Sequence, residues 1–141
     1  MSDDLETRLA FVRAFAQTSP YYKAMGMSIV EIEDRRAVLR VEIKDAHLNA
    51  DGIVHGGVLP AIADGAMGNA LRTLRGEAAQ VFTVEASLQY LRPVTSGSVI
   101  AEGRVVQSGR RISFAEVEIR DEASGKTVAR GTGVFVIEEK P

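Results

Sequence analysis

Residues 49–64 have the sequence NADGIVHGGVLPAIAD, in which a polar loop containing glycines runs directly into a helical pattern. We predict a helix over residues 56–74, because its apolar side chains recur at the three- and four-residue spacing of one helix face. This apolar stripe consists of Leu59, Ile62, Ala66, Ala70 and Leu74. It is the one long helix that the sequence predicts, so the rest of the fold must cover it.

Strands are predicted on both sides of this helix. Two precede it, over residues 25–33 and 35–44, and four follow it, separated by turns that contain glycine or proline, over residues 80–91, 98–107, 111–121 and 127–138. Short connections between consecutive strands indicate an antiparallel sheet. The long helix buries its stripe against that sheet, so the fold class is α+β.

A shorter helix is predicted at residues 3–16, where Leu5, Leu9 and Val12 share one face. Ser2 is expected to cap its first turn, and Ser19-Pro20 is expected to end it. The chain of 141 residues can form one core, and no linker, repeat or low-complexity tract divides it. We therefore interpret residues 1–141 as a single domain.

The composition excludes several classes of site and partner. The net charge of -2 offers no basic field to nucleic acid or to an anionic membrane. The chain has no cysteine, and its two histidines, His47 and His55, are too few for a metal site without a third ligand. The acidic start lacks the pattern of a signal peptide, and no apolar segment approaches the ~20 residues that span a bilayer. We expect a cytoplasmic protein without a metal or other cofactor.

Asp64 is a lone carboxylate in an otherwise apolar stretch of the long helix. Gly57, Ala61, Asp64 and Gly68 lie on one face of that helix, so the carboxylate has room above it. Gly65 and Gly68 cost helix stability, which indicates close approach of another group. One interpretation is a general base or nucleophile for acyl chemistry. The alternative is that this face packs a second helix and Asp64 is a solvated acid.

His55-Gly56-Gly57 stands where the long helix begins. If the helix starts here, the backbone N–H groups of Gly56 and Gly57 are unpaired, and they can stabilise an oxyanion at the positive end of the helix dipole. The alternative is an ordinary glycine-rich entry to a helix. Gly56 and Asp64 are eight residues apart, which places them ~12 Å apart along one helix. A site that uses both groups therefore requires two chains related by a two-fold axis.

The motif Asn49-x-x-Gly52-x-x-His55-Gly56-Gly57 followed by Ala63-Asp64 resembles the signature of hotdog-fold acyl-CoA thioesterases, in the PaaI-like branch of the phenylacetyl-CoA pathway. The resemblance covers nearly the whole chain and includes residues 83–93 and Gly125-Lys126. It implies a curved antiparallel sheet wrapped around the long helix. It also implies a homodimer formed by joining two sheets, and pairing of two dimers into a tetramer.

The resemblance also implies roles for individual residues. Gly56 N–H would polarise the thioester carbonyl, with Gly57 beside it, and Asn49 would help to hold the substrate. His55 would support this loop and contact the thioester or its leaving group. Asp64 of the partner subunit would act as a general base for water or as a nucleophile.

Thr83 would orient that water, although strand alternation works against this role. The apolar face of the strand over residues 80–91 contains Phe82, Val84, Ala86, Leu88 and Tyr90, so Thr83 should point away from it unless a bulge or the dimer crevice intervenes. Arg92, Arg110 and Arg111 stand near turns and would contact the phosphates of coenzyme A. Their alternative is ordinary solvated charge.

The sequence thus favours hydrolysis of an acyl-CoA to a free acid and coenzyme A, without a cofactor. The alternative is a non-catalytic domain that binds or senses acyl-CoA on the same scaffold. A hydratase or dehydratase of this fold would need a His–Asp or His–Glu pair in a different motif. His55 is followed by two glycines instead, so the sequence disfavours this third function.

Overall fold

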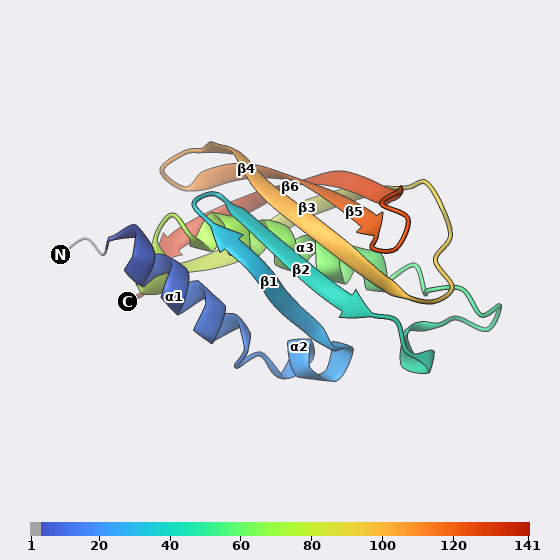
Figure 1. Ribbon diagram of the computed structural model, residues 1–141. Coiled ribbons are helices and arrows are strands. Elements are labelled where there is room, and N and C mark those ends of the chain that lie inside the picture. Colours follow the sequence, from blue (N-terminus) through green and yellow to red (C-terminus); the bar gives the residue numbers. More distant parts are fainter. Residues whose placement is uncertain (1–3) are drawn as a thin grey trace.

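The computed structural model describes residues 4–141 (Figure 1). Two helices come first and are followed by two strands, a long helix and four more strands. In chain order the elements are α1 (Leu5–Ala16), α2 (Pro20–Met25), β1 (Met27–Glu33), β2 (Arg36–Glu42), α3 (Val58–Arg72), β3 (Ala79–Tyr90), β4 (Ser98–Ser108), β5 (Ile112–Asp121) and β6 (Thr127–Glu139). Short 3-10 helices lie at Asp45–His47 and Gly76–Ala78.

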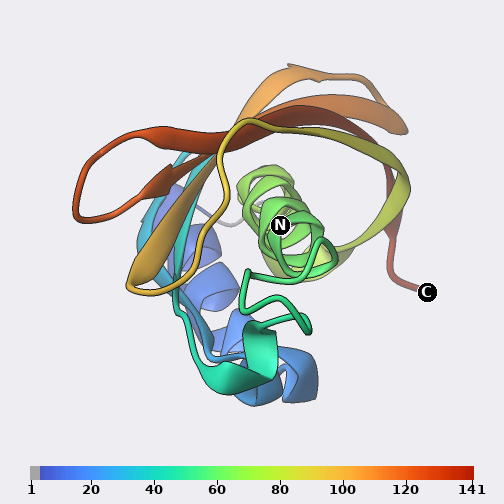
Figure 2. The same cartoon turned by 90° about the vertical axis from the view of Figure 1, so that its right-hand side faces the viewer.

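The six strands form one sheet in the order β1-β2-β4-β5-β6-β3, and every neighbouring pair is antiparallel. Figure 2 shows the sheet curving around α3, with α1 and α2 beyond the end strand β1. The predicted α+β arrangement and antiparallel sheet are confirmed. The predicted helix over residues 56–74 is two residues too long at each end.

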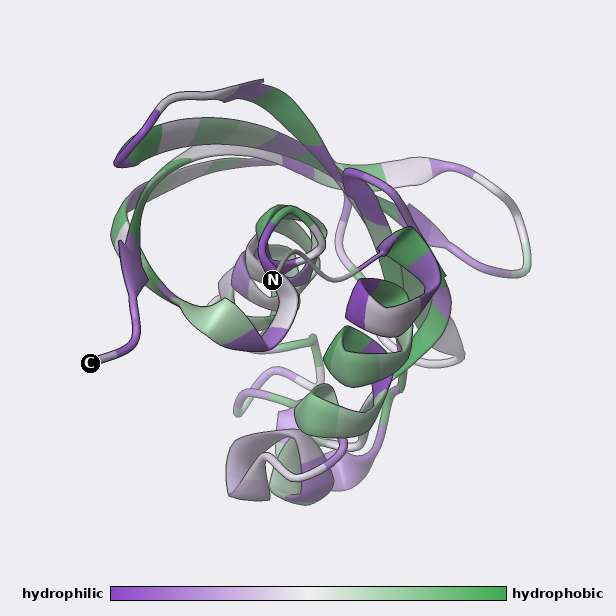
Figure 3. Ribbon diagram, turned by 90° about the vertical axis from the view of Figure 1, so that its left-hand side faces the viewer, coloured by the Kyte–Doolittle hydropathy of each residue, from purple (hydrophilic) through white to green (hydrophobic). Residues whose placement is uncertain are grey.

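The core lies between the concave face of the sheet and α3. Ile62, Ala66 and Ala70 are fully buried, as the apolar stripe predicted, and they face buried side chains such as Leu39 and Ile119. The sheet approaches the helix closely at β4, where a Cβ on Gly103 would lie 2.4 Å from the backbone of Ala66. Figure 3 shows α3 enclosed by strands along which hydrophobic and hydrophilic residues alternate.

The N-terminal part differs from the prediction in two ways. Ser2 lies outside the described residues, and α1 is instead capped by Asp4, whose Oδ1 accepts from Thr7 N–H at 2.8 Å. The second difference is a helix, α2, in the segment between the predicted helix and the predicted strand, which was expected to be irregular; only Met25 overlaps the predicted strand. Ser19 caps α2, Pro20 begins it, and Gly26 ends it with φ 69°. Proline favours the first position of a helix, so Ser19-Pro20 starts a helix rather than only stopping one.

β3 contains a bulge that changes which of its residues face α3. Thr83 pairs with Phe135 of β6, but Glu85 pairs with Val134, so Val84 is an extra residue in the strand. Val81 and Thr83 therefore face the helix before the bulge, and Leu88 and Tyr90 face it afterwards.

Candidate active site

Asp64 and Thr83 meet on the concave side of the sheet. Thr83 Oγ1 donates to Asp64 Oδ1 at 2.5 Å, within one chain, and both side chains border a groove beside α3. The alternation predicted for β3 had placed Thr83 on the face opposite to the apolar residues. The bulge at Val84 removes that difficulty, and Phe82 is the residue that points outward, with 47% of its surface exposed.

The loop before α3 carries the second half of the predicted site. Gly57 caps the helix, but its N–H donates to His55 Nδ1 at 2.9 Å, so the expectation of two unpaired glycine N–H groups was wrong for Gly57. Gly56 N–H has no acceptor among residues 4–141. A ring nitrogen that accepts is the unprotonated one, so the neutral His55 ring carries its proton on Nε2 and has one N–H donor left.

Tyr90 has a position that the sequence interpretation missed. Its hydroxyl donates to the carbonyl oxygen of Gly56 at 2.5 Å. This bond fixes the peptide that follows the free N–H of Gly56 and ties the end of β3 to the loop. The signal was present in the alternation of β3, which placed Tyr90 on the same face as Leu88.

Asn49 and His47 organise the loop around these groups. Asn49 Oδ1 accepts from the N–H groups of Asp51 and Ile53, at 2.9 and 3.1 Å, and so closes the turn. His47 is buried, and its ring bonds to Lys44 N–H and to Met25 O, both at 2.8 Å. His47 is therefore a loop-packing residue, and only the Nδ2 group of Asn49 is left for a ligand.

The groove beside α3 has a volume of about 430 Å³. Its α3 side is formed by Asp64, Gly65, Gly68, Asn69 and Arg72, so the groove extends along α3 beyond the carboxylate. A Cβ on Gly68 would meet no atom within 4 Å, so Gly68 opens onto free space and the close approach predicted there is wrong within one chain. Phe15, residues 18–20, Tyr22, Val81 and Phe135 form the other walls.

A glycine is needed at position 65 for a different reason. A Cβ there would lie 2.6 Å from Tyr22 Oη and 2.9 Å from Leu39, so the glycine lets α2 pack against α3. Asn69 Nδ2 donates to Tyr22 Oη at 2.9 Å and holds it there. Burial raises the pKa of the Tyr22 hydroxyl; the bond from Asn69 opposes this shift, and the nearby Asp64 carboxylate adds to it.

Known proteins are similar to this chain in sequence and fold. The family model described as the thioesterase superfamily matches residues 51–128, which contain His55-Gly56-Gly57, Asp64 and Thr83. The chain belongs to the thioesterase superfamily. A conserved protein from Pseudomonas aeruginosa is 32% identical, with a TM-score of 0.81 over 85% of this chain and 94% of that one.

Two further proteins are similar to this thioesterase-superfamily chain. A mutant of phenylacetic acid degradation protein PaaI from Thermus thermophilus is 31% identical, with a TM-score of 0.76 over 84% of this chain and 98% of that one. Human acyl-coenzyme A thioesterase 13 is 24% identical over 123 residues, which are 85% of this chain and 86% of that one. The resemblance to PaaI-like thioesterases and the hotdog fold predicted from it are confirmed.

The three arginines predicted to contact phosphates lie at two different ends of this thioesterase-superfamily chain. Arg92 follows β3, near the loop of Gly56, and donates to Thr127 O at 3.1 Å. Arg110 and Arg111 lie in the β4–β5 turn, at the opposite end of the sheet (Figure 1). Arg111 pairs there with Glu138 at 3.0 Å. Within one chain, the structure does not bring Arg110 and Arg111 to the loop.

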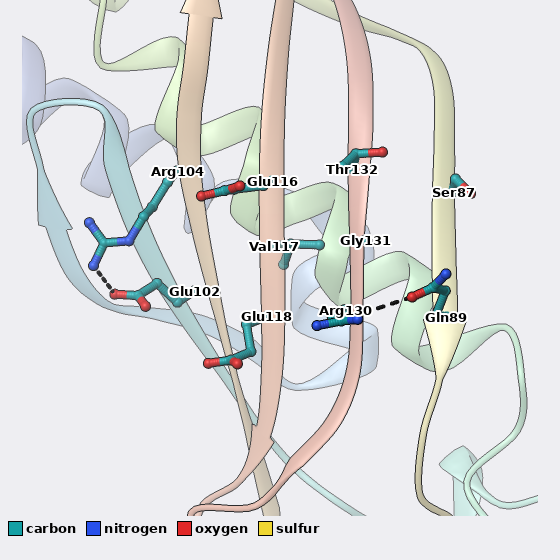
Figure 4. A pocket seen from close by; sticks show the side chains of 10 residues that line it. All are labelled: Ser87, Gln89, Glu102, Arg104, Glu116, Val117, Glu118, Arg130, Gly131 and Thr132. Carbon is teal, nitrogen blue, oxygen red and sulfur yellow. Dashed lines mark hydrogen bonds and ion pairs between the residues drawn. The ribbon is translucent and has the colours of Figure 1, made fainter.

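A second hollow, of about 500 Å³, lies on the face of the sheet turned away from α3 (Figure 4). It is lined by charged and polar residues of β3, β4, β5 and β6. Glu102 accepts there from Arg36 at 2.5 Å and from Arg104 at 2.9 Å. Burial acts to raise the pKa of Glu102, but the bond from Arg36 and the surrounding arginine charges outweigh it and hold the pKa below its usual value.

Two further features of the thioesterase-superfamily chain concern metal binding and membrane crossing. Residues 4–141 contain no group of three or more His, Cys, Asp or Glu side chains that could hold a metal ion. Over the same residues, none of the helices has the length and apolar character needed to cross a membrane.

Proposed function

We propose that this protein hydrolyses the thioester bond of an acyl-CoA to give a free acid and coenzyme A. The observation that carries the proposal is the Asp64 carboxylate, held by the Thr83 hydroxyl at 2.5 Å on the border of the 430 Å³ groove. No other residue among 4–141 donates a hydrogen bond to Asp64. One carboxylate oxygen is thus fixed by Thr83, and the other is free to accept a proton from water.

The proposed reaction uses the two halves of the site on opposite sides of the thioester. Asp64 takes a proton from water, and the hydroxide attacks the carbonyl carbon. The oxyanion accepts from Gly56 N–H at the start of α3 and from His55 Nε2–H. The carbon–sulfur bond then breaks, the thiolate leaves, and the proton on Asp64 returns to it or to solvent.

Within one chain these halves are too far apart for this chemistry. Eight residues of one helix separate Gly56 from Asp64, which corresponds to ~12 Å. We propose that a second copy completes the site by pairing along β3. This strand is an end strand of the sheet, spans Ala79–Tyr90, and exposes Phe82 and Val84. A long exposed strand edge is a natural site for pairing with another chain.

Release of thiol from a panel of acyl-CoA esters tests the hydrolase proposal. The panel contains aryl-acetyl, hydroxybenzoyl, short-chain and medium-chain esters, and it compares the natural chain with Asp64→Asn. The variant is expected to lose about two orders of magnitude or more in kcat. Glu116→Gln, on the outer face, is the matched control and should stay within about twofold of the natural chain.

A folded oligomer that binds these esters but cleaves none of them would contradict the proposal. It would favour the alternative, a non-catalytic domain that binds acyl-CoA.

Mixing two inactive variants tests whether the site is shared between chains. Gly56→Pro removes the N–H donor, and Asp64→Asn removes the base. After unfolding and refolding together, half of the dimers would be mixed, and each would contain one intact site, so about a quarter of the natural activity should return. A mixture that stays inactive, although mixed dimers are present, would place both groups in one chain.

A further inference from the structure

Arg72 is a cation at the end of the groove farthest from the start of α3. It lies eight residues after Asp64 on the same helix and lines the same groove. This spacing corresponds to ~12 Å along the helix axis. Gly68 lies between the two charged residues, and open space lies above it. The groove thus has a carboxylate at one end, a guanidinium at the other, and room between them.

The guanidinium has no acidic partner among residues 4–141. One of its N–H groups donates to Ala79 O at 2.9 Å, and its carbon lies 4.9 Å from the centre of the Phe15 ring. Both contacts leave other N–H donors unused. Burial lowers the pKa of Arg72, which reflects the loss of water around the charge. A partly buried charge without a counter-ion is unfavourable unless something pairs with it.

Tyr22 presents a second donor to the same groove, partway along α3. Its oxygen already accepts from Asn69, and its own O–H finds no acceptor within the described range of 4–141. The hydroxyl lies beside Gly65 and Asn69, two residues of α3 that fall between Asp64 and Arg72 in the chain. Unused donors from Arg72 and Tyr22 therefore border one groove, and this arrangement suits a group that carries negative charge.

We propose that the groove binds an acyl group that ends in a carboxylate, so that the substrate is the monothioester of a short dicarboxylic acid. The distal carboxylate is held by the Arg72 guanidinium and the Tyr22 hydroxyl, while its repulsion from Asp64 keeps it away from the reacting end. This inference rests on the proposed hydrolase function. A merely structural Arg72 would complement the dipole at the end of α3 and tie the helix to Ala79, with no selectivity between acyl groups.

A pair of esters of equal chain length separates these two roles. We expect the natural chain to hydrolyse adipoyl-CoA with a kcat/KM at least about tenfold higher than hexanoyl-CoA, because only the former carries a distal carboxylate. Arg72→Met should lower kcat/KM for adipoyl-CoA by about 10- to 100-fold, the size typical of a lost charged hydrogen bond, and leave hexanoyl-CoA within about twofold. Tyr22→Phe should lower adipoyl-CoA alone by a few-fold.

Equal kcat/KM values for the two esters in the natural chain would overturn the proposal. So would an equal loss for both esters in Arg72→Met, since that result describes a structural residue. A larger gain from a phenolic hydroxyl, measured as para-hydroxyphenylacetyl-CoA against phenylacetyl-CoA, would also overturn it in favour of a neutral polar end.

Two measurements keep the test decisive if a variant fails to fold or if no ester is cleaved. Adipate should inhibit or bind the natural chain at a concentration about tenfold lower than hexanoate does. Calorimetry on Asp64→Asn should show tighter binding of adipoyl-CoA than of hexanoyl-CoA. A binding preference for adipoyl-CoA, together with no turnover by the natural chain, would support the pocket and refute the hydrolase. Turnover by the natural chain without a preference would support the hydrolase and refute the pocket.

Discussion

The two hollows of this molecule are similar in size but opposite in how their charges are satisfied. On the outer face of the sheet, Glu102 is bound by Arg36 and Arg104, and Glu118 is bound by Arg120 at 2.5 Å. In the groove beside α3, Asp64 has only a threonine hydroxyl, and Arg72 has no acidic partner in the described part of the chain. Charges that already pair with one another need no ligand, whereas half-buried charges kept apart are available to bind one.

Among the changes that separate the two hollows, filling the groove should have the largest effect. Gly68→Leu places a branched side chain in the free space between Asp64 and Arg72, so hexanoyl-CoA should lose about hundredfold in kcat/KM, while acetyl-CoA changes by less than about fivefold. Steady-state kinetics on both esters measure the difference. Gly68→Ala is the control and should keep both activities. An equal loss on both esters would mean that the acyl group lies elsewhere.

The next largest effect is on stability, where alanine substitutions at two glycines of α3 should have opposite results. Gly65→Ala should destabilise the protein by about 1–2 kcal/mol, because its Cβ meets Tyr22 and Leu39 and this strain exceeds the gain in helix propensity. Gly68→Ala meets nothing and should stabilise by about 0.5–1 kcal/mol. Urea unfolding monitored by circular dichroism measures both. Equal changes of the same sign would refute the different roles given to the two glycines.

A smaller effect is expected from Thr83→Val, which keeps the shape of the side chain and removes the hydroxyl bound to Asp64. The carboxylate is then less well oriented, so kcat should fall about tenfold with little change in KM. Ser87→Ala, on the outer face of the same strand, is the control and should be unchanged. Full activity of Thr83→Val would show that the bond does not orient the base.

The smallest effect is expected on the outer face, where we predict a dependence of stability on pH. The pKa of Glu102 is lower in the folded chain than its ordinary value of 4.5, so its contribution is complete above that value and is lost as the pH falls through the lowered pKa. Glu102→Gln should reduce the loss of stability on acidification by at most about 1 kcal/mol and should leave hydrolysis unchanged. Urea unfolding of both proteins across this pH range measures the difference. A loss of activity in this variant would connect the outer face to the site.

The sequence predicted the layers of the fold well because they depend on repeating patterns. The stripe containing Ile62 and Ala66 identified α3, and alternation identified the strands. The short helix α2, between the predicted first helix and the predicted first strand, was missed because a serine–proline pair can end one helix or begin another. Pro20 does the second here, and the left-handed Gly26 that closes the short helix six residues later was the available signal.

The site was harder to predict because its parts come from distant positions. Asp64 was identified by its isolation in an apolar helix, but its contact with Thr83 depends on a one-residue bulge that has no local sequence signal. Tyr22 and Arg72, which we propose to bind the acyl group, were not predicted, although Gly65 correctly indicated that something approached the helix at that point. The bond from Gly57 N–H to His55 Nδ1 was missed because it depends on the conformation of the histidine side chain.

The bulge at Val84 also affects where this strand can change in length during evolution. Because of the extra residue, an odd-numbered position, Thr83, and an even-numbered one, Tyr90, both face α3. A deletion of Val84 would leave a regular strand in which both still face the helix and pair with β6 as before. A deletion nearer Tyr90 would instead turn the Glu85 carboxylate toward the core. Val84 is therefore a point at which an ancestral chain could gain or lose a residue without moving either half of the site.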